Sequence, residues 1–248
     1  MPRANRHRIA GQVWHITERC HRKQFLLKFA RDRRAWVGWL YEARQRFGLC
    51  VLDYQVTSNH VQLLVLDRGR DEIAASLQLI AGRTGQSFHQ RKRRRGAFWE
   101  DRYHATAVDT EEHLARCVVY IDLNMVRAGV VRHPRDWGEA GYHEIQHARG
   151  KYRVIDGAAL SGLLAVSEDR LAGLHEEWIE TTLASGHHAR EPKWSEAIAV
   201  GRRSFVEEVH QNLGARARRR KIAEEDGASM LRDADGTYGI ISRSKWAA

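Results

Sequence analysis

Two polar side chains interrupt an apolar segment whose pattern predicts a β-strand. His60 and Gln62 alternate with Val61, Leu63 and Val65, so the polar side chains leave one face of the sheet and the apolar side chains leave the other. Imidazole nitrogen and amide oxygen can both bind a divalent cation, and imidazole is acceptable to Mn²⁺. A rigid strand that presents these two donors on one face indicates a metal site.

A second polar pair lies in an apolar segment with helical spacing. Tyr120 and Asn124 are four residues apart, so they share one face of a helix. A tyrosine hydroxyl has an unperturbed pKa of about 10 and is a poor nucleophile until it is deprotonated. We predict that Tyr120 attacks a phosphodiester to form a covalent phosphotyrosine. We also predict that His60, Gln62 and Asn124 hold Mg²⁺ or Mn²⁺, which polarises the phosphate.

Each of these residues also has a structural interpretation. A single histidine in a strand is more often structural than a ligand, and a tyrosine on an apolar helix usually belongs to the core. Asp53 and His104 are further candidate ligands. The predicted ligand set contains no carboxylate, so we expect it to bind a metal well only when a DNA phosphate contributes.

The elements around these residues predict an α+β fold. Four strands and two helices follow one another in the order β-α-β-β-α-β, which is typical of the split β-α-β, ferredoxin-like antiparallel sheet. A further helix, capped by Asp109 or Thr110 and running to about Arg127, carries Tyr120 and packs beside the sheet. The expected strands cover 13–17, 49–56, 60–66 and 97–108, and the expected helices 32–47 and 71–88.

The chain after this sheet is less periodic. We expect a domain at residues 1–149 and a basic, mainly helical extension at residues 150–248, with helices at 171–183 and 194–213. Residues 215–221 form an arginine-rich run. The last twenty or so residues are rich in Gly, Asp and Ser and are expected to be partly disordered.

The charge of the chain predicts a polyanionic partner. Lys and Arg number 41 against 31 Asp and Glu, the net charge is +10 and the pI is about 9.9, so nucleic acid is the default candidate. The basic loop expected at residues 91–96 lies beside Phe98, Trp99 and Tyr103, as in a groove that tracks a single strand and stacks its bases. The candidate DNA-binding residues are Arg91, Lys92, Arg93, Arg94, Arg95, Trp99, Arg102 and Arg127.

The remaining composition indicates a cytoplasmic protein. The three cysteines have no metal-type spacing, and so sparse a set favours reduced thiols over a disulfide framework. The basic N-terminus is followed by no apolar run typical of a signal peptide. No segment approaches the roughly 20 apolar residues of a membrane span.

Three segments together resemble the single-tyrosine HUH transposases, in particular the REP-associated tyrosine transposases of bacteria. They are 56–65, 96–104 and 120–129, and the resemblance covers roughly residues 10–145. It implies cleavage and rejoining of single-stranded DNA at hairpins by a monomer or homodimer. In that comparison Tyr120 is the nucleophile, Asn124 a metal ligand and His60 the first histidine of the HUH motif. Gln62 stands where the family has its second histidine.

Two other functions remain open from the sequence. Gln62 is a neutral ligand, so the chain could be a hairpin-binding regulator on the same fold with weakened catalysis. A basic sheet with aromatic side chains is also found in modules that bind single-stranded RNA.

Overall fold

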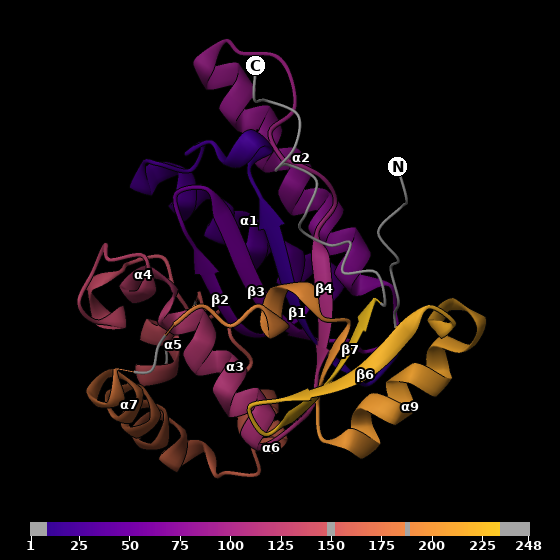
Figure 1. Cartoon of the computed structure of the whole chain (residues 1–248). Coiled ribbons are helices and arrows are strands. Elements are labelled where there is room, and N and C mark those ends of the chain that lie inside the picture. Colours follow the sequence, from indigo (N-terminus) through magenta and orange to yellow (C-terminus); the bar gives the residue numbers. More distant parts are fainter. Residues whose placement is uncertain (1–8, 148–151, 187–188, 234–248) are drawn as a thin grey trace, which may run out of the picture.

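A seven-stranded, mainly antiparallel sheet organises the chain (Figure 1). The computed structural model describes residues 9–147, 152–186 and 189–233. The strands lie in the order β2-β3-β1-β4-β5-β7-β6. Helices cover both sides of this sheet, so the α+β class predicted from the sequence is confirmed.

The first four strands and two helices form the predicted split β-α-β arrangement. In chain order they are β1 (Val13–Arg19), α1 (Ala30–Phe47), β2 (Cys50–Val56), β3 (His60–Leu66), α2 (Glu72–Lys92) and β4 (His104–Val108). Strand β3 lies between β1 and β2, and β1 lies between β3 and β4, with every pair antiparallel. Helices α1 and α2 lie together on one side of this sheet (Figure 1).

Two predicted boundaries near the basic run are wrong. Helix α2 continues to Lys92, so Arg91 and Lys92 are helical and only the following arginines lie in a loop. Gly82 and Gly85 lie inside the helix without breaking it, and the helix ends where Arg93 takes a left-handed conformation, with φ 48°. Strand β4 begins at His104 and not near residue 97. Residues 97–103 are irregular apart from a single bridge between Trp99 and Cys20.

The expected helix after β4 is divided in two. Helix α3 spans Glu112–Asp122 and α4 spans Asn124–Arg127. Leu123 departs from helical geometry only slightly, because its amide still donates to Val119 and its carbonyl still accepts from Arg127. The helix starts later than predicted, since the Asp109 carboxylate binds the Arg202 side chain instead of capping it.

The C-terminal part contributes three strands to the same sheet, so it is less purely helical than expected. Strand β5 (Ala199–Gly201) runs parallel to β4, and β7 (Ala228–Asp233) pairs with both β5 and β6 (Arg220–Glu225). The helix expected at 194–213 is therefore wrong: α8 (Lys193–Glu196) and α9 (Arg203–Leu213) flank β5. The apolar residues from 197 to 200 are buried, and the strand itself begins at Ala199.

The remaining helices lie partly before residue 150 and partly in the extension. They are α5 (Tyr142–Gln146), α6 (Gly157–Leu163) and α7 (Glu168–Ser185), with short 3₁₀ turns η1 (His21–Lys23), η2 (Pro134–Asp136) and η3 (Gly214–Ala217). Helix α7 contains the predicted helix at 171–183. The second arginine run leads into β6. Residues 148–151 and the expected disordered tail from 234 onwards lie outside the described residues, and the division near residue 149 stays a prediction.

The face of the sheet opposite α1 and α2 carries buried polar side chains, among them Gln55 and His15. Gln55 of β2 donates from Nε2 to the backbone oxygen of Asp122 in α3, and His15 of β1 contacts the backbone oxygen of Trp194 in α8. Helices α3 and α8 therefore cover this face. Within the described ranges, no helix is both long enough and apolar enough to cross a membrane. The three cysteines are buried free thiols.

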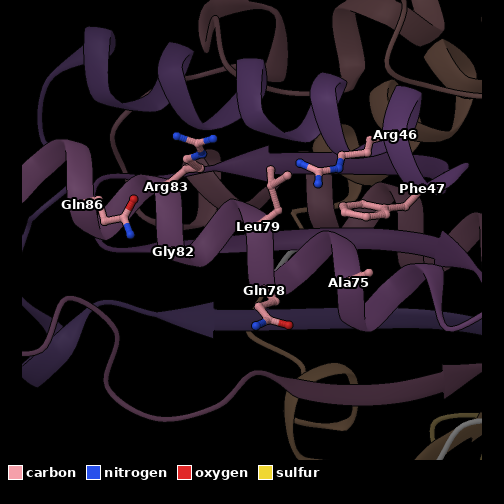
Figure 2. A pocket seen from close by; sticks show the side chains of 8 residues that line it. All are labelled: Arg46, Phe47, Ala75, Gln78, Leu79, Gly82, Arg83 and Gln86. Atoms are coloured by element: carbon pink, nitrogen blue, oxygen red, sulfur yellow. The ribbon is translucent and has the colours of Figure 1, made fainter.

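A groove of about 420 Å³ lies between α1 and α2. Figure 2 shows its lining, which is Arg46 and Phe47 from α1 with one face of α2. Its described lining residues include no histidine, cysteine or carboxylate, so the imidazole of the predicted ligand set has no counterpart there.

Candidate active site

A cavity of about 490 Å³ brings the two predicted polar pairs together. His60 and Gln62 come from β3, and Tyr120 and Asn124 come from α3 and the first residue of α4. Residues separated by some sixty positions in the sequence therefore meet, as the spacing predicts. The cavity is also lined by Thr17, Glu18, Arg19, Glu100, Asp101, Arg102, His104, Arg127, Ala128, Arg190, Ser195 and Glu196.

The His60 ring is held in one tautomer. Its Nδ1 lies 2.9 Å from Thr57 Oγ1 and 2.8 Å from Asn59 Oδ1. Thr57 Oγ1 donates its own hydrogen to the His60 backbone oxygen at 2.8 Å, so it accepts from Nδ1–H. This leaves the Nε2 lone pair of His60 free for a ligand, the usual arrangement of a metal-binding imidazole.

Burial keeps His60 neutral. Desolvation lowers the pKa of His60 to about 4, with further lowering from the charges of Arg19 and Arg127. A metal ligand must be an unprotonated imidazole. The His60 side chain therefore has the protonation state and the orientation that a ligand requires.

Gln62 shares its amide with a buried histidine. His15 Nε2 lies 3.0 Å from Gln62 Oε1, and His15 Nδ1 lies 2.8 Å from the Trp194 backbone oxygen. Burial lowers the pKa of His15 to about 4, so this ring has one N–H, which donates to the Trp194 carbonyl. Nε2 must then accept. Flipping the Gln62 amide, which exchanges its Oε1 and Nε2 atoms, lets the amide N–H donate to His15 Nε2 and points the amide oxygen away from His15.

Tyr120 lies at the wall between two cavities. Its side chain is buried, and this desolvation raises the pKa of the phenol while the charge of Arg127 lowers it. The Arg127 guanidinium lies 3.9 Å from the centre of the Tyr120 ring. A second cavity of about 590 Å³ is also lined by Tyr120 and Arg127, together with Val119, Leu123 and Trp178.

Carboxylates line the first cavity, contrary to the expectation of a site without them. They are Glu18, Glu100, Asp101 and Glu196. Desolvation raises the pKa of Glu18 to about 8, so an adjacent cation would favour its ionised form. No cluster of three or more His, Cys, Asp or Glu side chains in the described ranges is arranged to hold a metal. One neutral imidazole, amide oxygens and nearby carboxylates nevertheless fit a hard cation that keeps several waters.

Of the two other candidate ligands, His104 and Asp53, only His104 lies at the cavity. His104 lines the cavity, with Nε2 3.0 Å from the Ala197 backbone oxygen. Asp53 is fully buried on β2, accepts from the Tyr54 amide, and is absent from the cavity lining. The structure does not bring Asp53 to the site.

The predicted DNA-binding residues divide into two groups. Arg102 and Arg127 line the cavity. The run from Arg91 lies at the end of α2, where Arg91 pairs with Asp32 and Arg94 donates to Gln24. Trp99 is half-buried and donates to the Ala81 backbone oxygen at 3.2 Å.

Several residues of the site were missed in the sequence. His15 and the segment 190–196 lie in no distinctive motif. Thr57 lies in the matching segment 56–65, but its role was not predicted, although a hydroxyl three residues before His60, in a turn, is a typical partner for local hydrogen bonds.

The chain is similar to known proteins in two comparisons, one of sequence and one of fold. Residues 11–124 match the family model described as "Transposase IS200 like", so the predicted resemblance to this class of transposase is confirmed over that part of the chain. A solved structure described as "Structure of the REP associates tyrosine transposase bound to a REP hairpin" shares the fold. Its TM-score is 0.50 at 21% sequence identity, and the match covers 62% of this chain and 90% of that one. No curated protein shows significant sequence similarity.

Proposed function

We propose that this protein cleaves and rejoins single-stranded DNA at hairpin-forming sequences through a 5′-phosphotyrosine at Tyr120, as a single-tyrosine HUH transposase. One observation carries the proposal: Tyr120 and Asn124 share one cavity with His60 and Gln62. The four residues lie together within one chain, which supports a site built by one subunit, in a monomer or a homodimer. The similar solved structure contains a REP-associated tyrosine transposase bound to a REP hairpin, which supports a DNA hairpin as the substrate.

The reaction exchanges one phosphodiester for another. The Tyr120 oxygen attacks phosphorus, and the bond to the departing 3′ oxygen breaks. The proton that the phenol loses balances the proton that the 3′ oxygen gains. Because the phosphotyrosine keeps the bond energy, a 3′ hydroxyl can later attack it and rejoin a strand without ATP.

The residues around Tyr120 assist this exchange in distinct ways. Arg127 lowers the pKa of the phenol against the effect of burial and presents a guanidinium to the phosphate oxygens. His60 Nε2, Gln62 and Asn124, with the nearby carboxylates, would hold Mg²⁺ or Mn²⁺. When bound, the cation polarises the phosphate and stabilises the developing charge on the leaving oxygen.

The test is covalent capture. A labelled single-stranded hairpin is incubated with the protein and Mn²⁺, and a denaturing gel is examined for a protein–DNA adduct. We expect an adduct that Tyr120→Phe abolishes. Tyr142→Phe, the same change in a buried tyrosine on α5, should leave it intact. An adduct that survives Tyr120→Phe would refute the assignment.

The contact between Gln62 and His15 favours a second candidate. If Gln62 serves only as the partner of His15 and binds no cation, the site loses a metal ligand and the protein acts as a hairpin-binding regulator. Binding of the hairpin without any adduct would support this function. Tighter binding of RNA than of DNA with the same sequence would instead indicate an RNA-binding module.

A further inference from the structure

Two aromatic side chains are exposed in the connection between η1 and α1. Phe25 is 67% exposed and Phe29 is 48% exposed. Few large apolar side chains of the described residues are so exposed; the others are Val130 and Tyr152. Two such side chains four residues apart mark a contact surface more strongly than scattered single ones.

Hydrogen bonds and buried side chains fix the backbone of this connection, so the fold itself determines that the two rings are exposed. Leu26 and Leu27, between the two phenylalanines, are buried, and the Leu27 amide donates to Ser58 O at 2.9 Å. Buried Arg33 donates to the backbone oxygens of Leu27 and Lys28 and pairs with Glu139 at 2.8 Å. The aromatic rings are presented outward by a backbone that is anchored from inside.

Two cations lie over the Phe29 ring. The Arg31 guanidinium lies 5.7 Å from the centre of the Phe29 ring, and Lys92 Nζ lies 5.3 Å from it. Exposed Arg22, Lys23 and Lys28 are neighbours in the sequence. Asp32, the adjacent acid, is already paired with Arg91. The surface therefore combines apolar rings with unneutralised positive charge.

The connection that carries the two rings contacts the residue that precedes His60. Asn59 Nδ2 donates to the Lys23 backbone oxygen at 3.3 Å, and Asn59 Oδ1 lies 2.8 Å from His60 Nδ1. Only one residue therefore separates the basic connection from the imidazole predicted to hold the metal. A strand with its phosphate in the cavity can extend across this surface.

We propose that Phe25 and Phe29 form a stacking platform for unpaired bases of the DNA strand whose phosphate enters the Tyr120 cavity. The proposal rests on the proposed function for the identity of the polymer. Aromatic rings stack on any base while neighbouring cations bind the backbone. The charge favours a polyanion over an apolar segment of another protein. The platform replaces the predicted role of Phe98, which is buried against Phe88 and Trp99.

The experiment separates base stacking from charge. Anisotropy measures binding of the full chain to an oligothymidine strand and to an abasic strand of the same length. We expect the double variant F25A/F29A to bind oligothymidine about tenfold more weakly and the abasic strand as tightly as the unchanged protein. Tyr152→Ala, at another exposed aromatic residue, should change neither affinity. Lys92→Ala should weaken both strands and reduce the salt dependence.

Each other outcome overturns the platform. No loss on oligothymidine, or an equal loss on both strands, means that the rings do not stack on bases. A larger effect on RNA of the same length would show that DNA is not the ligand. Adduct formation at Tyr120 is measured separately on the hairpin, so failure of the proposed chemistry is distinguishable from failure of the platform.

Discussion

The guanidinium of Arg127 lies 3.9 Å from the centre of the Tyr120 ring, and its Nη2 donates to the Tyr120 backbone oxygen at 2.6 Å. The arginine is therefore fixed to the residue that we propose as the nucleophile. Burial raises the pKa of the phenol, and the Arg127 charge is the first effect that lowers it. A nucleophile that must lose a proton in a buried site depends on such a charge.

Arg127→Ala is expected to slow adduct formation by about a hundredfold, as when one transition-state donor is removed. Loss of the positive charge also raises the pKa of Tyr120 further, so the rise of the rate with pH should move to higher pH. Single-turnover adduct formation between pH 6 and 10 measures both effects. Arg116→Ala, an exposed arginine of α3 paired with Glu112, is the control. An unchanged pH profile in Arg127→Ala would contradict the role of its charge.

Thr57→Val is expected to weaken Mn²⁺ binding by about ten- to a hundredfold, the usual cost of losing an outer partner of a ligand histidine. The reason is that Thr57 Oγ1 accepts from His60 Nδ1–H and so directs Nε2 to the cavity. Calorimetric titration with Mn²⁺ in the absence of DNA gives the affinity. Thr57→Ser keeps the hydroxyl and should restore it. Equal weakening by both variants would show that the methyl group, and not the hydrogen bond, matters.

Gln62→His is expected to preserve or raise cleavage, since imidazole is a stronger ligand than an amide for Mn²⁺. Gln62→Leu, similar in size but without a donor atom, should lower both Mn²⁺ affinity and adduct yield. Gel-based adduct yield at several Mn²⁺ concentrations compares the three proteins. A marked loss in Gln62→His would mean that position 62 serves His15 and not a metal.

The first part of the sheet follows from the sequence because its signals are local. Alternation around His60 and helical spacing before Phe47 each depend on one stretch of chain, and Gly48 ends α1 in the left-handed conformation with φ 70°. The placement of Tyr120 and His60 at one cavity was predictable in a different way. It required two separate polar pairs, each on one face of its element, and a topology that places those faces together.

The remainder of the site depends on contacts between distant segments. Trp194 is buried over His15, and Glu196 lines the cavity, yet neither lies in a motif. The strand at 199–201 is only three residues long, too short for alternation to predict. Its conformation is set by pairing with β4 and β7. The exposure of Phe25 and Phe29 could not be predicted either, because a sequence does not show which of its aromatic residues are buried in the core.

The pH dependence of stability provides the last test, through His15. The pKa of His15 is about 4 in the folded protein, against 6.5 for an unperturbed histidine, so between these values the unfolded chain binds a proton that the folded protein does not. Stability from this residue is therefore full above about pH 7 and is lost as the pH falls towards 4. The shift corresponds to roughly 3 kcal/mol for a fully buried ring. Urea unfolding at pH 7.5, 6.5, 5.5 and 4.5 should show the loss.

His15→Gln is the matched variant, because it keeps a polar side chain but cannot be protonated. It should be less stable than the unchanged protein at pH 7.5, since it cannot reproduce both the Trp194 and Gln62 contacts. Its stability should nevertheless fall less steeply between pH 7 and 4. Glu18 acts in the opposite direction, because its folded pKa of about 8 makes its contribution more favourable as the pH falls. The comparison of the two slopes cancels Glu18 and isolates the histidine. If the unfolding free energy falls equally steeply with pH in both proteins, protonation of His15 is not the cause of the loss.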